Sequence, residues 1–139
     1  MRLSCYLKSR RSWGEPCQKR VQGFTASRLC ARRALAEFGI LDFPVQVAVN
    51  REPLWPQSLV GSITHAEGFS AAVVAQRRMI LAIGIDCERA DYVTPDVWDL
   101  ICTPTESIWR ASLSLDERIA AAALLFAAKE AFYKCQYPL

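Results

Sequence analysis

The amino-acid sequence predicts an α+β domain. Three observations indicate it: residues 24–38 have apolar side chains at helical spacing, short runs rich in Val, Ile and Ala occupy the middle of the chain, and residues 114–117 form a capping-box pattern ahead of a long helical stretch. With 139 residues the chain can bury one sizeable core but not two independent ones. We therefore expect a single domain over residues 1–139.

The first expected helix covers residues 24–38. Good helix formers fill this segment, and its apolar residues, such as Leu35, recur three or four positions apart. Gly39 follows where the pattern stops, and glycine is the residue that most often ends a helix. Arg28 and Arg32 are four residues apart, so they lie on one face of this helix.

Strands are expected on both sides of a proline-containing loop. Residues 45–49 alternate apolar and polar side chains, and residues 62–65 form a second short candidate. Residues 51–56 contain two prolines, which cannot donate ladder hydrogen bonds, so an extended loop is expected there. A β-hairpin is expected from residues 70–76 and 79–88, because only a polar turn separates these two apolar runs.

Three helix starts follow the predicted hairpin. Thr94 and Thr103 each precede a proline, which is the arrangement of an N-cap residue before a proline at the first helical position. Ser114 begins a capping box with Glu117, and the helix that it opens is expected to run through about residue 135.

Cysteine usage and hydropathy limit the class of protein. The six cysteines form no CxxC pair and no metal-ligand spacing, and residues 1–12 lack the apolar segment of an export signal. Reduced thiols and a cytoplasmic location are therefore expected. No run approaches the roughly 18 to 20 apolar residues that a membrane span requires, so no membrane span is expected.

Positive charge gathers in the first quarter of the chain, although the net charge is only +3, and acidic residues gather after residue 83. This asymmetry favours an anionic ligand near the first quarter, and a solvated basic surface is the alternative. Nucleic acid is not expected as a partner, because the basic residues are neither periodic nor interleaved with aromatic ones. The basic residues are Lys8, Arg10, Arg11, Lys19, Arg20, Arg28, Arg32 and Arg33.

Three carboxylates have the chemistry of a magnesium site. Asp86 and Glu88 are two apart on an extended segment, so both project to the same side and offer hard oxygen ligands, which suit Mg²⁺ better than Zn²⁺. A solvated polar exit from a strand is the alternative. Glu130 continues an apolar stripe on the last helix and needs a partner, which is either a metal ion or Lys134 one turn further on.

The order of these residues resembles a known family. Gly84-Ile-Asp-Cys-Glu88 and, some forty residues later, Phe126-Ala-Ala-Lys-Glu-Ala-Phe-Tyr-Lys134 are similar to the G-I-D-x-E and (F/W)-x-x-K-E-x-x-x-K signature of 4'-phosphopantetheinyl transferases. Residues 61–65, Arg51-Glu-Pro and Ser27-Arg28 resemble further segments of that family. The W-P and G-S-I-T-H variants resemble its siderophore-synthetase-activating branch, the enterobactin type.

The resemblance implies an activity. The chain would transfer 4'-phosphopantetheine from coenzyme A to a serine of an acyl or peptidyl carrier protein, releasing 3',5'-ADP with Mg²⁺ as cofactor. By this resemblance Asp86, Glu88 and Glu130 would hold the ion. Lys134 would stabilise or protonate the departing ADP, and either Glu130 or Glu106 would deprotonate the serine. The residues that would bind coenzyme A are Arg28, Arg51, Thr64, His65, Lys129 and Lys134.

The same resemblance implies a 4'-phosphopantetheinyl transferase-like fold of two similar α/β halves with coenzyme A in the cleft between them. The first half would cover about residues 20–90, and the second would begin within residues 91–139 but lack the strands after its main helix, so a fragment with an incomplete second half is expected. One alternative is a catalytically inactive fragment that binds only coenzyme A or a carrier protein. A second is another Mg²⁺-dependent enzyme that cuts phosphodiesters.

Overall fold

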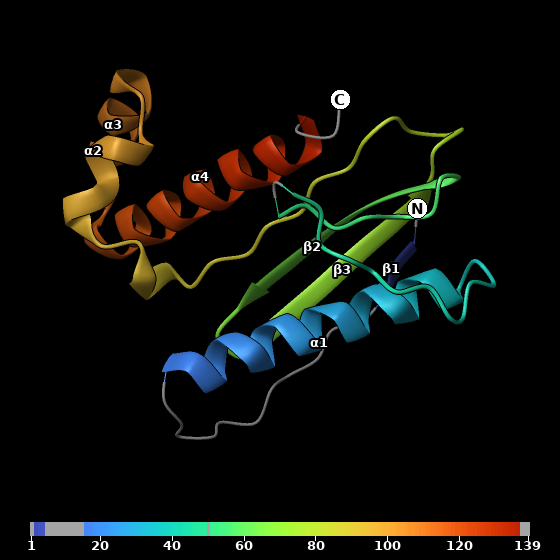
Figure 1. Ribbon diagram of the computed structural model, residues 1–139. Helices are drawn as coiled ribbons and strands as arrows, with labels where there is room; N and C mark the ends of the chain where they lie inside the picture. The colour runs from blue at the N-terminus through green and yellow to red at the C-terminus, as the bar shows by residue number, and fades with distance from the viewer. Residues whose placement is uncertain (1, 5–15, 50, 137–139) are drawn as a thin grey trace.

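The computed structural model describes residues 2–4, 16–49 and 51–136 of the chain (Figure 1). Their architecture is α+β, which confirms the predicted class. A three-stranded antiparallel sheet with the strand order β1-β3-β2 lies between two long helices. Helix α1 (Pro16–Ala36) packs on one face of this sheet, and helix α4 (Leu115–Gln136) lies on the other side, beyond the extended chain of residues 79–89 (Figure 1).

Helix α1 begins earlier than the predicted start at residue 24 and ends at Ala36, just before the predicted end at residue 38. The amide of Gly39 donates to the carbonyl of Ala36 and the amide of Ile40 to that of Leu35, at 2.9 and 3.2 Å. This is the Schellman arrangement, and it requires the positive φ of 77° that Gly39 adopts without strain. The side chains of Cys30, Ala31, Ala34 and Leu35 are buried against the sheet.

The sheet is built on one hairpin. Strand β2 (Leu59–Ala66) pairs with β3 (Phe69–Gln76) through a tight turn at Gly68, and the short β1 (Arg2–Ser4) pairs with the other edge of β3. The strand predicted at residues 62–65 therefore exists and is longer. Along β2 the side chains alternate, so Leu59 and Ile63 face α1 and its core, whereas Ser62 and Thr64 face the opposite side.

Two strand predictions are wrong. Residues 45–49 form only an isolated bridge between Val47 and Pro53, because the chain turns back at Arg51, which has a φ of 73°, and proline cannot extend a ladder. Residues 79–88 do not pair with β3 as the second strand of a hairpin. Both edges of β3 are already taken by β1 and β2, so this segment crosses the face of the sheet instead.

The helices after residue 89 begin near the predicted caps. Thr103 forms a complete capping box with Glu106 at the start of α3 (Pro104–Ala111), and the amide of Ser114 donates to the carboxylate of Glu117 before α4. Thr94 makes no side-chain cap, and the chain there forms only single turns. These turns are η1 (Ala90–Tyr92), η2 (Pro95–Val97) and α2 (Trp98–Ile101).

Among the residues whose side chains are described, the buried ones form two clusters rather than the one core that the length of the chain led us to expect. The first lies between α1 and the sheet. The second lies between α4 and the short helices and is built from Val93, Trp98, Ala122 and Ala123. The clusters are separate because the segment of residues 79–89 keeps α4 away from the sheet (Figure 1).

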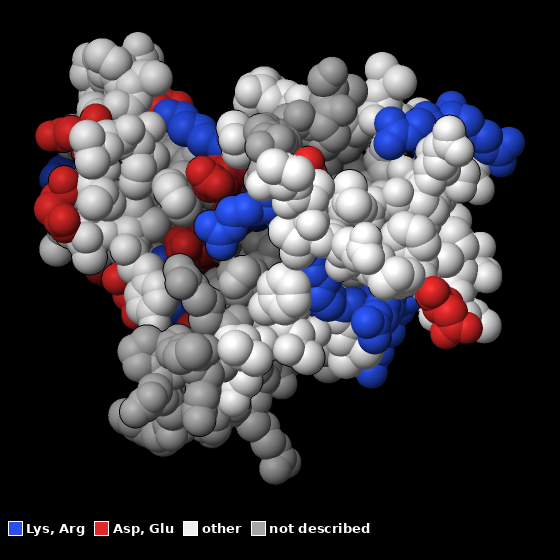
Figure 2. All heavy atoms as spheres, in the orientation of Figure 1, with Lys and Arg blue, Asp and Glu red and all other residues white. Residues whose placement is uncertain are grey.

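Figure 2 shows Lys and Arg side chains over α1 and elsewhere on this face, and Asp and Glu side chains over α2 and α3. Of the basic residues that the sequence analysis grouped in the first quarter, Arg28, Arg32 and Arg33 are described, whereas the side chains of the others lie outside the described part of the chain; these are Lys8, Arg10, Arg11, Lys19 and Arg20. Within the described ranges, no helix combines the length and hydropathy needed to cross a membrane.

Candidate functional site

An ion pair joins the two motif segments that are far apart in the sequence. The Nζ atom of Lys134, on α4, lies 2.6 Å from Oδ1 of Asp86 and 3.4 Å from the carbonyl oxygen of Ile63 on β2. The Asp86 side chain is only 10% exposed and that of Lys134 is 32% exposed. A carboxylate with so little exposure needs a cationic partner, and Lys134 provides it.

Gly84 allows the segment that bears Asp86 to pack directly against α4. A Cβ atom at position 84 would lie 1.8 Å from the carbonyl oxygen of Ala131 and 2.7 Å from the amide nitrogen of Cys135, both on the backbone of α4. No side chain fits at that distance, so only glycine allows the extended segment to contact the helix backbone directly. The contact lies beside Lys134, and it therefore brings Asp86 within reach of the ammonium group.

Two hydroxyl groups of β2 hold the extended segment on the sheet. The amide of Ile85 donates to Oγ of Ser62 at 3.1 Å, and the amide of Cys87 donates to Oγ1 of Thr64 at 3.0 Å. The Thr64 hydroxyl also donates to Oδ1 of Asp86 at 3.0 Å. Sequence reasoning missed Ser62 and this use of Thr64, although two hydroxyl residues at i and i+2 on a predicted strand were a visible signal.

The structure does not gather the three predicted metal ligands into one cluster. Within residues 2–4, 16–49 and 51–136 there is no group of three or more His, Cys, Asp or Glu side chains arranged to hold a metal ion. Glu88 is half-buried and accepts the amide of Arg89 at 2.8 Å. Glu130 is half-buried, and among the described residues it makes no hydrogen bond or ion pair.

The alternative helix salt bridge between Glu130 and Lys134 is not formed, since Lys134 pairs with Asp86. The donor chemistry still suits Mg²⁺. This ion is usually held by one or two carboxylates together with waters and substrate phosphates, so it does not require a preformed cage of three side chains. Asp86 and the unpartnered Glu130 are carboxylates of that kind.

Glu106 and Lys129 form a second ion pair, at the junction of α3 and α4. Nζ of Lys129 lies 2.6 Å from Oε2 of Glu106 and 2.6 Å from the carbonyl oxygen of Ile101. The hydrogen bond from Lys129, together with the backbone amide of Thr103, lowers the pKa of Glu106. Glu106 is therefore held ionised, and the same contacts make it a weaker base.

Arg28 has an unsatisfied donor. Its Nε atom is buried without a hydrogen-bond partner among the described residues, and its guanidinium lies 4.8 Å from the ring centre of Phe24. Burial lowers the pKa of Arg28. A partly desolvated cation with a spare N–H group is suited to an oxyanion ligand.

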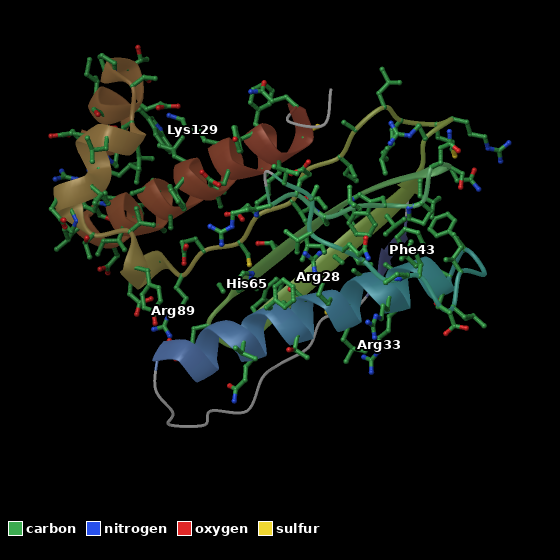
Figure 3. All side chains as sticks on the ribbon, viewed as in Figure 1. Arg28, Arg33, Phe43, His65, Arg89 and Lys129 are labelled. Atoms are coloured by element: carbon green, nitrogen blue, oxygen red, sulfur yellow. The ribbon has the colours of Figure 1, made fainter. Side chains whose placement is uncertain are left out.

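His65 and Arg51 are placed by backbone features. The ring of His65 lies over Gly23 of α1, where a Cβ atom would be 2.8 Å from its Cδ2 atom. His65 and Arg28 therefore both lie on the side of the sheet that α1 covers, as Figure 3 shows. Arg51 is exposed at the turn of the long loop, and its side chain contacts none of the other predicted site residues among those described.

Cys87 stands between the two predicted ligands but is not a nucleophile candidate. Burial raises the pKa of its thiol, with smaller opposing and reinforcing effects from its neighbours. The thiolate fraction is therefore small, and the thiolate is the reactive form of cysteine.

Two family models match this chain. Residues 15–75 match the 4'-phosphopantetheinyl transferase N-terminal domain, and residues 82–139 match the 4'-phosphopantetheinyl transferase superfamily. The two matches follow each other along the chain, with residues 76–81 between them. The chain belongs to the 4'-phosphopantetheinyl transferase superfamily, as the resemblance of its motifs indicated.

Several individual members of the superfamily are similar to this chain. The chain is 38% identical over 122 residues to the 4'-phosphopantetheinyl transferase Npt of Nocardia iowensis, and 40% identical over 126 residues to PptT of Mycobacterium tuberculosis. It is 34% identical over 119 residues to enterobactin synthase component D of Escherichia coli, which confirms the predicted enterobactin-type relationship. These alignments cover 88%, 87% and 84% of this chain, and 54%, 53% and 55% of the respective relatives. The chain thus spans about half the length of the curated relatives it matches.

Proposed function

We propose that this chain transfers the 4'-phosphopantetheine group of coenzyme A to a serine hydroxyl of an acyl or peptidyl carrier protein. In this reaction the serine oxygen bonds to the phosphorus that bears pantetheine, the phosphoanhydride bond of coenzyme A breaks, and 3',5'-ADP leaves. The observation that most supports the proposal is the Asp86–Lys134 contact, because it unites the two motif segments of the family in one place.

The proposal gives each charged group near Asp86 a role. The proposal places the pyrophosphate of coenzyme A at Asp86, and the ammonium group of Lys134 lies beside that carboxylate. Lys134 would therefore stabilise the negative charge on the departing ADP and supply a proton to it. Of the two base candidates we favour Glu130. It has no partner among the described residues, whereas Glu106 is bound to Lys129 and has a lowered pKa.

Magnesium is the proposed cofactor, with Asp86, Glu88 and Glu130 as its proposed ligands. When bound, it would neutralise charge on the pyrophosphate of coenzyme A. Oδ1 of Asp86 accepts from both Lys134 and Thr64, so Oδ2 would be the oxygen that Asp86 offers to the ion.

Coenzyme A is proposed to pass around the edge strand β2, with its pyrophosphate at Asp86 and its other phosphate oxygens on the basic α1 side of the sheet. The spare N–H group of Arg28 and the exposed ring of His65 both lie on the α1 side of the sheet, where phosphate oxygens would satisfy them. Arg51, Lys129 and Lys134 remain predicted contacts, and Lys129 would have to leave Glu106 to reach a phosphate.

Mass spectrometry of a carrier protein tests the function directly. An apo acyl carrier protein and an apo peptidyl carrier domain, incubated with this chain, coenzyme A and Mg²⁺, should each be assayed for a mass gain of one phosphopantetheine group. The gain should vanish when the carrier serine is replaced by alanine and when Mg²⁺ is chelated. Binding of coenzyme A without any mass gain would instead support the alternative of an inactive binding fragment.

The role of Arg28 is tested with two substrates. Replacing Arg28 with methionine is expected to raise the KM for coenzyme A about tenfold, because a charge-assisted hydrogen bond to phosphate is lost. If Arg28 contacts the 3'-phosphate, dephospho-coenzyme A, which lacks that group, should show little change. Arg32→Met, a replacement one turn away on the same helix, is the matched control. Equal losses with both substrates would show that Arg28 does not contact the 3'-phosphate.

A further inference from the structure

We infer that Thr64 is a positioning residue: its hydroxyl group fixes the Asp86 carboxylate and the backbone at Cys87 against strand β2. The inference rests on the proposed function, because it assigns Thr64 to the support of the carboxylate that the proposal places at the reacting phosphates. The sequence resemblance had assigned Thr64 to coenzyme A binding instead.

The hydrogen-bonding capacity of Thr64 is fully used inside the protein. A threonine hydroxyl has one hydrogen to donate and two lone pairs to accept with. Its hydrogen goes to Oδ1 of Asp86 at 3.0 Å, one lone pair accepts the amide of Cys87 at 3.0 Å, and Sγ of Cys87 lies 3.3 Å away. The side chain is 3% exposed. A hydroxyl group so placed has no capacity left for a phosphate oxygen.

Thr64 acts from a rigid element. It lies inside the β2–β3 ladder, paired with Ala71, and its branched Cβ restricts χ1. The segment that bears Asp86 has no ladder of its own. Its amides at Ile85 and Cys87 bond instead to the hydroxyl groups of β2, and the Thr64 hydroxyl also bonds to Asp86 itself, so the direction of the carboxylate depends on Thr64.

Ser62 provides a matched comparison. It lies two residues before Thr64, faces the same side of the sheet, is equally buried, and accepts one amide of the same segment. Among the described residues Ser62 makes no hydrogen bond to Asp86, whereas Thr64 does. If transfer depends on the orientation of the Asp86 carboxylate, and not only on the attachment of residues 79–89 to β2, loss of the Thr64 hydroxyl should impair transfer. Loss of the Ser62 hydroxyl should not.

The test uses three variants of the whole chain. Thr64→Val removes the hydroxyl at nearly constant volume, Thr64→Ser restores it, and Ser62→Ala removes the neighbouring one. Amide hydrogen exchange at Cys87 and Ile85 reports which contact is lost, independently of activity. Transfer kinetics then separate kcat from the KM for coenzyme A, and Mn²⁺ titration measures the affinity for a divalent ion.

For Thr64→Val we expect faster exchange at Cys87, a kcat about 10- to 100-fold lower, weaker Mn²⁺ binding and a nearly unchanged KM, which is the usual effect of removing a group that orients a ligand. Thr64→Ser should recover most of the kcat. Ser62→Ala should speed exchange at Ile85 alone. If valine is not tolerated, Thr64→Ala removes the same hydroxyl and serves the same comparison.

Two results would overturn the inference. An unchanged kcat in Thr64→Val with fast exchange at Cys87 would show that the contact exists but positions nothing. A raised KM for coenzyme A with an unchanged kcat in Thr64→Val would show that Thr64 binds coenzyme A, as the sequence resemblance implied. Failure of the unmodified chain to transfer would reject the proposed function instead, and the Mn²⁺ titrations of the same variants would still decide whether Thr64 orients Asp86.

Discussion

Replacing Asp86 with asparagine is expected to lower transfer about a hundredfold to a thousandfold while the chain remains folded. Asparagine has the shape of aspartate and can still accept hydrogen bonds from Thr64 and Lys134, so the contacts between β2, the extended segment and α4 persist. The negative charge proposed to hold Mg²⁺ is lost, and such an ion supplies several kcal/mol of charge stabilisation at a transferring phosphoryl group.

The alanine variant should behave differently. Asp86→Ala leaves the ammonium group of Lys134 without its carboxylate, and since this pair is only partly exposed we expect about 1–3 kcal/mol of lost stability in addition. Asp91→Asn is the control, because Asp91 is an exposed acid five residues away whose partner is Arg89. Transfer assays and thermal unfolding separate the two effects. Activity of Asp86→Asn within about tenfold of the unmodified chain would contradict the role of this carboxylate.

Replacing Gly84 with alanine is expected to lower the stability of the chain by about 3 kcal/mol or more and to abolish transfer. The added Cβ atom would lie 1.8 Å from the carbonyl oxygen of Ala131, and a helix backbone cannot move aside as a flexible side chain can. The extended segment must then shift away from α4, which separates Asp86 from Lys134.

Gly68→Ala separates this steric effect from the loss of glycine as such. Gly68 has a φ of 79°, but no atom lies within 4 Å of the Cβ that alanine would add. Its replacement should therefore cost only the strain of a left-handed residue, about 1–2 kcal/mol, and should spare transfer. Thermal unfolding of the two variants measures the difference. Equal destabilisation would mean that the segment does not pack on α4 as described.

Local chemistry explains why parts of the fold were predictable. Gly39 ends α1 because only glycine adopts the positive φ of that turn without strain, and Thr103 begins α3 because its hydroxyl accepts an orphan amide of the helix. Such features depend on a few adjacent residues, so they are visible in the sequence. The division into halves near residue 90 and the individual site assignments stay predictions.

The path of residues 79–88 was not predictable in the same way. Its composition is that of a strand, and a strand is what the sequence indicated. Whether a strand-like segment finds a ladder depends on which edges of the sheet remain free, and here β1 and β2 occupy both edges of β3. The salt bridge considered between Glu130 and Lys134 is not formed for a similar reason, since Lys134 pairs with Asp86, 48 positions earlier in the chain.

The sequence by itself determined the class of the fold, the starts of α3 and α4 and the family, because caps, periodicity and the order of motif residues are local or can be read along the chain. Only the tertiary structure decided which charged groups meet. Asp86 and Lys134 come together because Gly84 lets one backbone approach another and because the Thr64 hydroxyl bonds to the Asp86 carboxylate and to the amide of Cys87. These are contacts between distant segments, and their energies depend on distances and burial that no residue pattern specifies.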